Sequence, residues 1–133
     1  KRCRNIHVSF LDQGILYDYL QSGAFEKYIK KARKFYGEKF NFAYKCVEKY
    51  IPNEYIFGDG GLHLFLKFKN IDTRELLNKC YKKGVIFMPG DIFYINNEIN
   101  NTLRLGFSRL SFEEIEKGIK IIGDTIKELP IDD

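Results

Sequence analysis

One helical pattern, from Ala24 to Tyr50, constrains the fold of this 133-residue chain more than any other stretch. Its apolar residues recur at steps of three and four, the spacing of one face of an α-helix. They are Phe25, Ile29, Ala32, Phe35, Tyr36, Phe40, Ala43, Val47 and Tyr50. Pro52 stops such a helix, so we expect a long amphipathic helix that packs one face against another element. A shorter helical pattern, from Val8 to Gln21, precedes it and ends at Ser22-Gly23.

The pattern changes to period two after the glycine-rich turn at 58–61. Leu62, Leu64, Leu66 and Phe68 then share one face, which predicts a strand. Two more short strands are predicted, over 85–88, before Pro89-Gly90, and over 103–108. In the last strand Leu103 and Leu105 point one way, and Arg104 points the other.

Two further helices carry capping-box signatures, Asp72 with Glu75 and Ser111 with Glu114. The resulting order is helix, helix, strand, helix, strand, strand, helix. Three strands cannot bury both faces unaided, so helices must cover at least one face. We therefore predict an α+β fold of two layers, a small and mainly antiparallel sheet covered by helices.

Composition excludes several classes of protein. With 44% hydrophobic and 30% charged residues, the chain is neither disordered nor fibrous. The longest apolar run is too short to span a membrane, and no apolar segment follows Lys1–Arg4 as in a signal peptide. The three cysteines, Cys3, Cys46 and Cys80, lack the spacing of a zinc site. We expect reduced thiols in a cytoplasmic protein and no metal site.

The net charge of +4 is too small to indicate a nucleic-acid surface. Basic residues do gather between Lys27 and Lys34, where a solvated helix face is our interpretation and a phosphate-binding stripe is the alternative. His63 lies opposite the leucines of its strand, which favours a structural or solvent-facing role. Arg104, at the centre of a strand, suits bidentate binding of a carboxylate. An ion pair or a merely exposed sheet face are the alternatives for that arginine.

Several short segments together resemble a known family. They are Gly60 to Leu66, Gly84-Val85, Pro89-Gly90, Phe93, Leu103 to Ser108, Glu113 to Ile115, and Gly118. In this order and spacing the chain resembles the C-terminal small domain of fold-type I pyridoxal-phosphate aminotransferases. It is most similar to 2-aminoadipate-type aminotransferases and to the aminotransferase-like domain of the MocR branch of GntR transcriptional regulators.

A segment upstream of the strands carries the same resemblance. Ser22-Gly23 through Tyr28, Arg33, Tyr36 and Lys39 is similar to the family's run of glycine, histidine, arginine, tyrosine and arginine. Tyr28 stands where the family often has histidine, and Lys39 where it often has arginine. An enzyme and a regulator therefore both remain open.

The resemblance implies a role for Arg104, which would bind the α-carboxylate of an amino-acid substrate or effector. Pro89, Gly90 and Phe93 resemble the family's loop at the active-site entrance. The family's Schiff-base lysine follows a serine, and none of the four serines here precedes a lysine. The resemblance thus implies no catalytic residue in this chain. It implies pyridoxal 5′-phosphate in a parent protein, with none bound to this chain alone, which would be inactive.

The resemblance also implies an organisation and a set of partners. We expect one domain over 1–133, with leading helices over 8–50 that join a large pyridoxal-phosphate-binding domain of the same polypeptide, and a sheet-and-helix part over 51–133. Because Met88 is the only methionine, we expect a piece of a longer protein. That parent would be a cytoplasmic homodimer, away from membranes, and would contact DNA only through a separate N-terminal domain.

One alternative belongs to another class of protein. A free-standing α+β ligand-binding or protein-interaction module would use the same sheet face without catalysis. A domain taken from a larger protein should leave Leu11, Ile15 and Phe25 partly uncovered, whereas a free-standing module should not.

Overall fold

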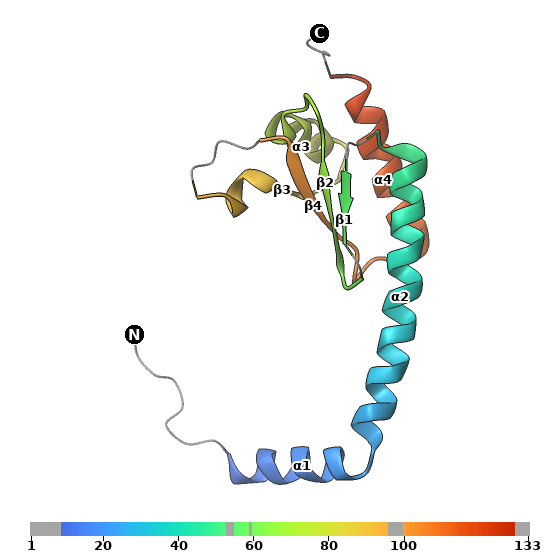
Figure 1. The fold of residues 1–133 in the computed structure, drawn as a ribbon, viewed down its shortest axis with the longest axis vertical. Helices are drawn as coiled ribbons and strands as arrows, with labels where there is room; N and C mark the ends of the chain where they lie inside the picture. Colours follow the sequence, from blue (N-terminus) through green and yellow to red (C-terminus); the bar gives the residue numbers. More distant parts are fainter. Residues whose placement is uncertain (1–8, 53–54, 59, 96–99, 130–133) are drawn as a thin grey trace. The chain divides into compact units, whose positions relative to one another are not determined.

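The structure, a computed structural model, describes residues 9–52, 55–58, 60–95 and 100–129 (Figure 1). They fall into two compact units that divide between Phe35 and Tyr36. The elements are α1 (Phe10–Gln21), α2 (Ala24–Tyr50), β1 (Tyr55–Phe57), β2 (His63–Lys67), α3 (Thr73–Lys82), β3 (Met88–Pro89), the 3₁₀ helix η1 (Gly90–Phe93), β4 (Thr102–Gly106) and α4 (Phe112–Ile126). Helix α2 begins in the first unit and ends in the second.

The first unit holds α1 and the first turns of α2. The Ser9 hydroxyl caps α1 by accepting a hydrogen bond from the Asp12 amide at 3.3 Å. Gly23, at a φ of 70°, makes the turn into α2, a conformation that favours glycine. Both predicted helices are thus present, the first over Phe10–Gln21 and the second over Ala24–Tyr50, while residue 8 lies outside the described residues.

Large apolar side chains of the first unit stay exposed. Leu11 is 70% exposed, Ile15 61% and Phe25 40%. This is the exposure expected of a domain taken from a larger protein. Large apolar side chains left this exposed often contact another part of a protein.

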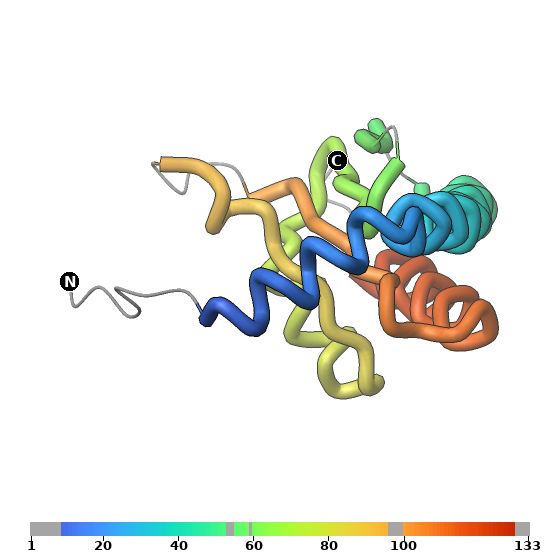
Figure 2. The backbone as a smooth tube through the Cα atoms, turned by 90° about the horizontal axis from the view of Figure 1, so that it is seen from below, coloured from blue at the N-terminus to red at the C-terminus, as the bar shows by residue number. Residues whose placement is uncertain are grey.

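The second unit is a four-stranded antiparallel sheet covered on one face by helices (Figure 1). The strand order is β1-β2-β4-β3. The last turns of α2 lie beside α4 on the covered face (Figure 2). The predicted α+β, two-layer, mainly antiparallel architecture is confirmed.

A single hydrophobic core lies between the sheet and its helices. Its buried members are Ala43, Cys46, Val47, Ile51, Leu64, Leu66, Phe68, Leu76, Cys80, Phe87, Leu103, Leu105, Phe107, Ile115, Ile119, Ile122 and Ile126. Leu64 and Leu66 of β2 and Leu105 of β4 come from the strand faces that the period-two pattern predicts. The opposite face of the sheet carries no covering helix among the described residues.

The two helix starts predicted from capping residues are present. Ser111 and Glu114 form the complete reciprocal box at the start of α4. At α3, the Asp72 carboxylate accepts hydrogen bonds from the amides of Arg74 and Glu75. Gly84, at a φ of 81°, follows the last turn of α3 as predicted.

The prediction of a strand over 85–88 is wrong. The strand is Met88–Pro89, at the edge of the sheet. Val85 belongs to the helix end, since its amide donates to the Cys80 carbonyl at 3.0 Å and is not available to a strand. Proline has no backbone N–H to donate. Pro89 is tolerated because β3 is an edge strand, which has a neighbouring strand on one side only.

The sequence interpretation also missed one strand. Tyr55–Phe57 forms β1, paired with β2 from Tyr55↔Lys67 to Phe57↔Phe65. The described residues therefore form a four-stranded sheet, where three strands were predicted. A run of three residues between Pro52 and Gly58 gives too little periodicity to recognise, although tyrosine, isoleucine and phenylalanine all favour strands.

Cys46 and Cys80 are buried free thiols, as expected, while Cys3 lies outside the described residues. Burial raises the pKa of both thiols above their ordinary value of 9.0. Above about pH 9 the unfolded thiols lose protons that the folded thiols keep, so the free energy of unfolding should fall as pH rises there. Urea unfolding followed from neutral pH upward measures this slope. The double variant Cys46→Ala, Cys80→Ala should show a shallower slope, and an equal slope would contradict the expectation.

Candidate functional site

The open face of the sheet brings side chains from four strands into one row. Antiparallel pairing places Phe57 opposite Phe65, Phe65 opposite Arg104, and Arg104 opposite Met88. Because side chains alternate along each strand, all four project from the face without helices. The row therefore surrounds one guanidinium with apolar side chains.

Arg104 is held by two neighbours on this face. Its guanidinium carbon lies 4.9 Å from the centre of the Phe93 ring, a cation–π contact. Its Nη2 lies 2.9 Å from the Met88 sulfur. Among the described residues no carboxylate forms an ion pair with Arg104. The guanidinium is thus oriented by an aromatic ring and a thioether sulfur, and no described carboxylate compensates its charge.

Aromatic rings extend the row on both sides of Arg104. Phe57 contacts Phe65 at 6.3 Å between ring centres, and Phe65 contacts Phe93 at 6.1 Å. Tyr55 contacts Phe57 at 6.0 Å. Phe57 remains 52% exposed and Phe93 46%. This aromatic face is a surface suited to cover an apolar group bound beside the arginine.

Gly90 fixes the position of the segment that carries Phe93. A Cβ at Gly90 would lie 1.8 Å from the Thr102 hydroxyl oxygen, so no larger residue fits between η1 and β4. Pro89 is buried and pairs with Leu103. Of the three residues predicted at a site entrance, Pro89 and Gly90 therefore position the backbone, and Phe93 contacts Arg104.

An ion pair that the sequence interpretation missed anchors η1 from the other side. The buried carboxylate of Asp91 accepts a hydrogen bond from Arg74 Nε of α3 at 2.5 Å. The residues are 17 positions apart, and no local pattern links them. Together with the Gly90 contact, this pair holds the 3₁₀ helix against the sheet.

Lys39 and His63 have different surroundings. Lys39 is buried, and its ammonium donates to the Ser108 carbonyl at 2.9 Å, which ties α2 to the turn after β4. His63 is exposed opposite Gly106, in agreement with a solvent-facing role. His63 is not the register partner of Arg104, which is Phe65, and Lys39 belongs to a helix.

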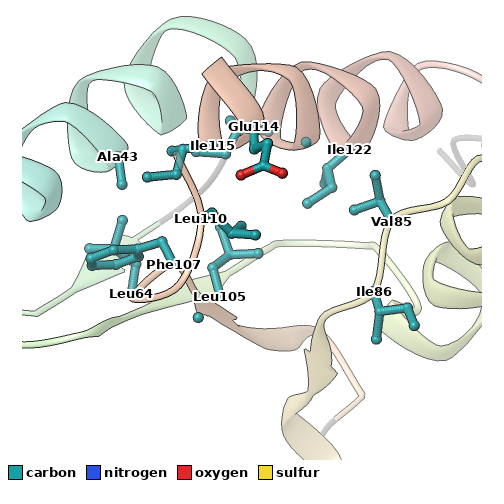
Figure 3. A pocket seen from close by; sticks show the side chains of 13 residues that line it. Ala43, Leu64, Val85, Ile86, Leu105, Phe107, Leu110, Glu114, Ile115 and Ile122 are labelled. Atoms are coloured by element: carbon teal, nitrogen blue, oxygen red, sulfur yellow. The ribbon is translucent and has the colours of Figure 1, made fainter. Parts of the chain in front are cut away.

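A pocket lies on the covered side of the sheet (Figure 3). Its walls come from α2, β2, the segment after α3, β4 and α4. The lining residues are Ala43, Leu64, Val85, Ile86, Leu105, Gly106, Phe107, Leu110, Glu114, Ile115, Gly118, Ile119 and Ile122. Apart from Glu114 this lining is apolar.

The described residues contain neither a cluster of metal ligands nor a membrane-spanning helix. No group of three histidine, cysteine, aspartate or glutamate side chains gathers as metal ligands in the described ranges. Within the same ranges, no helix has the length and apolar character needed to cross a bilayer.

No family model matches the chain, but individual proteins do. An aromatic-amino-acid aminotransferase of Thermococcus litoralis is 30% identical over 131 residues, which are 96% of this chain and 31% of that enzyme. An uncharacterised HTH-type transcriptional regulator of Bacillus subtilis is 29% identical over 85% of this chain and 25% of the regulator. The chain spans only a quarter to a third of the length of these relatives.

A solved structure agrees with the sequence relatives. The α-aminoadipate aminotransferase of Thermus thermophilus, complexed with N-(5′-phosphopyridoxyl)-L-leucine, superposes with a TM-score of 0.80. It is 26% identical, and the match covers 93% of this chain and 32% of that chain. These comparisons confirm the resemblance that the sequence motifs indicate.

Proposed function

Because the chain is a homologue of aminotransferases and of HTH-type transcriptional regulators, we propose that it is the small, amino-acid-binding domain of a fold-type I aminotransferase or of a regulator with an aminotransferase-like domain. Arg104 binds the α-carboxylate of the amino acid. The observation that carries this proposal is the guanidinium at the centre of the open face, which has no ion-pair partner among the described residues.

The surroundings of Arg104 suit this role chemically. A guanidinium donates two parallel N–H···O bonds to a carboxylate, which fixes both the position and the plane of the bound group. The contact with Phe93 restrains the guanidinium before the ligand arrives, so less side-chain entropy is lost on binding. The orientation of the amino acid around its Cα then follows from the strand that holds the arginine.

We propose that a part of the parent outside these 133 residues binds pyridoxal 5′-phosphate, which supplies electron withdrawal at the amino-acid Cα when bound. Two lysines beside the sheet already contact other protein groups. On the open face the Lys67 ammonium lies 5.9 Å from the centre of the Tyr55 ring, and the buried Lys39 donates to Ser108. The apolar pocket offers a phosphate only the repelling carboxylate of Glu114.

Two outputs are compatible with this domain. The aminotransferase relatives favour turnover of the bound amino acid, and the regulator relative favours sensing of an effector. In both, the partners are the amino acid, the large domain and a second copy of the parent. A regulator would contact DNA through a separate N-terminal domain. Both outputs use Arg104 together with a cofactor-binding half of the parent. A free-standing module would use the same sheet face without that half.

Substitution of Arg104 in the intact parent tests the proposal. Arg104→Ala should raise the amino-acid KM, or the effector Kd, by about 100-fold, because two charge-assisted hydrogen bonds are lost. The pyridoxal absorbance band should remain, since the arginine does not hold the cofactor. An exposed arginine in the next turn provides the matched control, Arg109→Ala, which should leave affinity unchanged.

A ligand without the α-carboxylate distinguishes a direct contact of Arg104 with that group from a structural role of the arginine. An amine analogue that lacks the α-carboxylate should bind equally to the parent and to Arg104→Ala. An affinity for the amino acid that is unchanged in Arg104→Ala would mean that Arg104 is structural and would refute the proposal.

A further inference from the structure

The pocket on the covered side of the sheet is separate from the proposed carboxylate site. Arg104 and Leu105 are consecutive in β4, so they point to opposite faces of the sheet. Leu105 lines the pocket, whereas Arg104 belongs to the open face. A molecule in the pocket would therefore bind behind the strand that carries the arginine.

The pocket is large enough for a small organic group. Its volume is about 60 Å³, where a single water needs roughly 10–15 Å³. The floor consists of buried apolar residues, including Leu64, Ile115 and Ile122. Water gains few hydrogen bonds in such a space, so an alkyl chain or the edge of an aromatic ring enters it more favourably.

Glu114 gives the pocket its single charge among the described lining residues. Figure 3 shows its carboxylate directed toward the hollow between Leu105 and Ile122. One oxygen, Oε2, accepts the Ser111 amide at 2.7 Å, which fixes the side chain as part of the helix cap. Among the described residues no donor hydrogen-bonds to Oε1. The cap thus holds an acceptor at the mouth of an apolar space.

The charge state of this acceptor follows from its partners. Hydrogen bonds from Ser111, and more weakly the positive charge of Lys39, lower the pKa of the Glu114 carboxyl. The carboxylate is therefore ionised at neutral pH. The Lys39 ammonium donates to the Ser108 carbonyl. A ligand ammonium group can donate a hydrogen bond to Oε1 and balance the negative charge of the carboxylate. A ligand carboxylate would be repelled.

We propose that this pocket binds a small primary amine with an apolar tail. The tail lies among Leu105, Ile115 and Ile119, and the ammonium donates to Glu114 at the mouth. The site is independent of Arg104, which takes the opposite charge on the opposite face of the sheet.

Benzylamine, with benzyl alcohol as its neutral counterpart, tests the proposal on the 133-residue chain. Methyl NMR of isotope-labelled protein follows Leu105, Ile115 and Ile119, with Ile29 of α2 as a remote reference. Benzylamine should shift the three pocket methyl signals and leave Ile29 in place. Benzyl alcohol should bind at least tenfold more weakly. Equal binding of the two probes, binding of neither, or shifts confined to the open face would each overturn the proposal.

Charge variants test the carboxylate. Glu114→Gln keeps a side chain that completes a capping box but lacks the charge. It should weaken benzylamine about tenfold and leave benzyl alcohol unchanged. Glu113→Gln removes a neighbouring charge that does not line the pocket, and should change neither affinity. If the two substitutions weakened benzylamine equally, Glu114 would act only through the overall negative charge of the surface, and the proposed site would be refuted.

A steric variant tests the cavity. Gly118 lines the pocket one turn after Glu114, and a Cβ there meets no atom within 4 Å. Gly118→Leu should fill the hollow and abolish benzylamine binding without unfolding the chain, which circular dichroism checks. Gly37→Leu is the control, because Gly37 is also unhindered within a helix but lies outside the pocket. Undiminished binding in folded Gly118→Leu would exclude this pocket as the site.

Discussion

Gly123→Ala is expected to lower the free energy of unfolding by about 3 kcal/mol, at the upper end of the usual cost of overpacking. A Cβ at Gly123 would lie 2.1 Å from the Tyr50 carbonyl oxygen, where α4 passes the end of α2. Backbone cannot rotate away as a flexible side chain does, so the helices must separate. That movement would also disturb the 2.7 Å hydrogen bond from Tyr50 to Glu116.

Gly118→Ala is the matched control for this measurement by urea unfolding. It lies on the same helix, where a Cβ meets nothing within 4 Å. Its effect should be a stabilisation of about 0.5–1 kcal/mol, from helix propensity alone. Similar changes at the two glycines would contradict the close crossing of α2 and α4.

Phe68→Ala should have the largest effect of all, a loss of about 4 kcal/mol of unfolding free energy. Phe68 is 1% exposed and is the largest fully buried side chain among the described residues. Its truncation removes apolar contacts and leaves a cavity that the surrounding sheet and helices fill only in part. Thermal or urea unfolding measures the loss.

Phe57→Ala provides the comparison, because Phe57 has the same side chain on the open face and is 52% exposed. Its substitution should cost less than about 1 kcal/mol, mainly from lost ring contacts with Phe65. A cost comparable to that of Phe68→Ala would mean that the open face is part of the stabilising core.

Local signals predicted the helices well and the edges of the sheet poorly. Capping by Ser111 with Glu114, and the glycine that follows α3, are short-range chemistry visible in a few residues. The error at 85–88 arose because Val85 is apolar like a strand residue, yet its amide completes the end of α3. Such competition for one amide is decided by tertiary structure and not by residue type.

The candidate site was predictable only in part. The alternation around Arg104 indicated its face, but its neighbours come from other strands and from η1. Met88 and Phe65 adjoin it through strand register, and Phe93 through the packing of Gly90 on Thr102. A single sequence contains no register between strands, so the aromatic face could not be derived from it.

The short outer strands have a consequence for how this chain behaves in concentrated solution. On one side of the sheet β1 has three residues, and on the other β3 has two, one of which is Pro89. Strands this short, with a proline, offer little template for the stacking that builds fibrils. When copies of the chain adhere to one another, the contact is therefore expected through exposed helical leucines and isoleucines such as Leu11 and Ile15. Clusters formed in that way should dissolve on dilution.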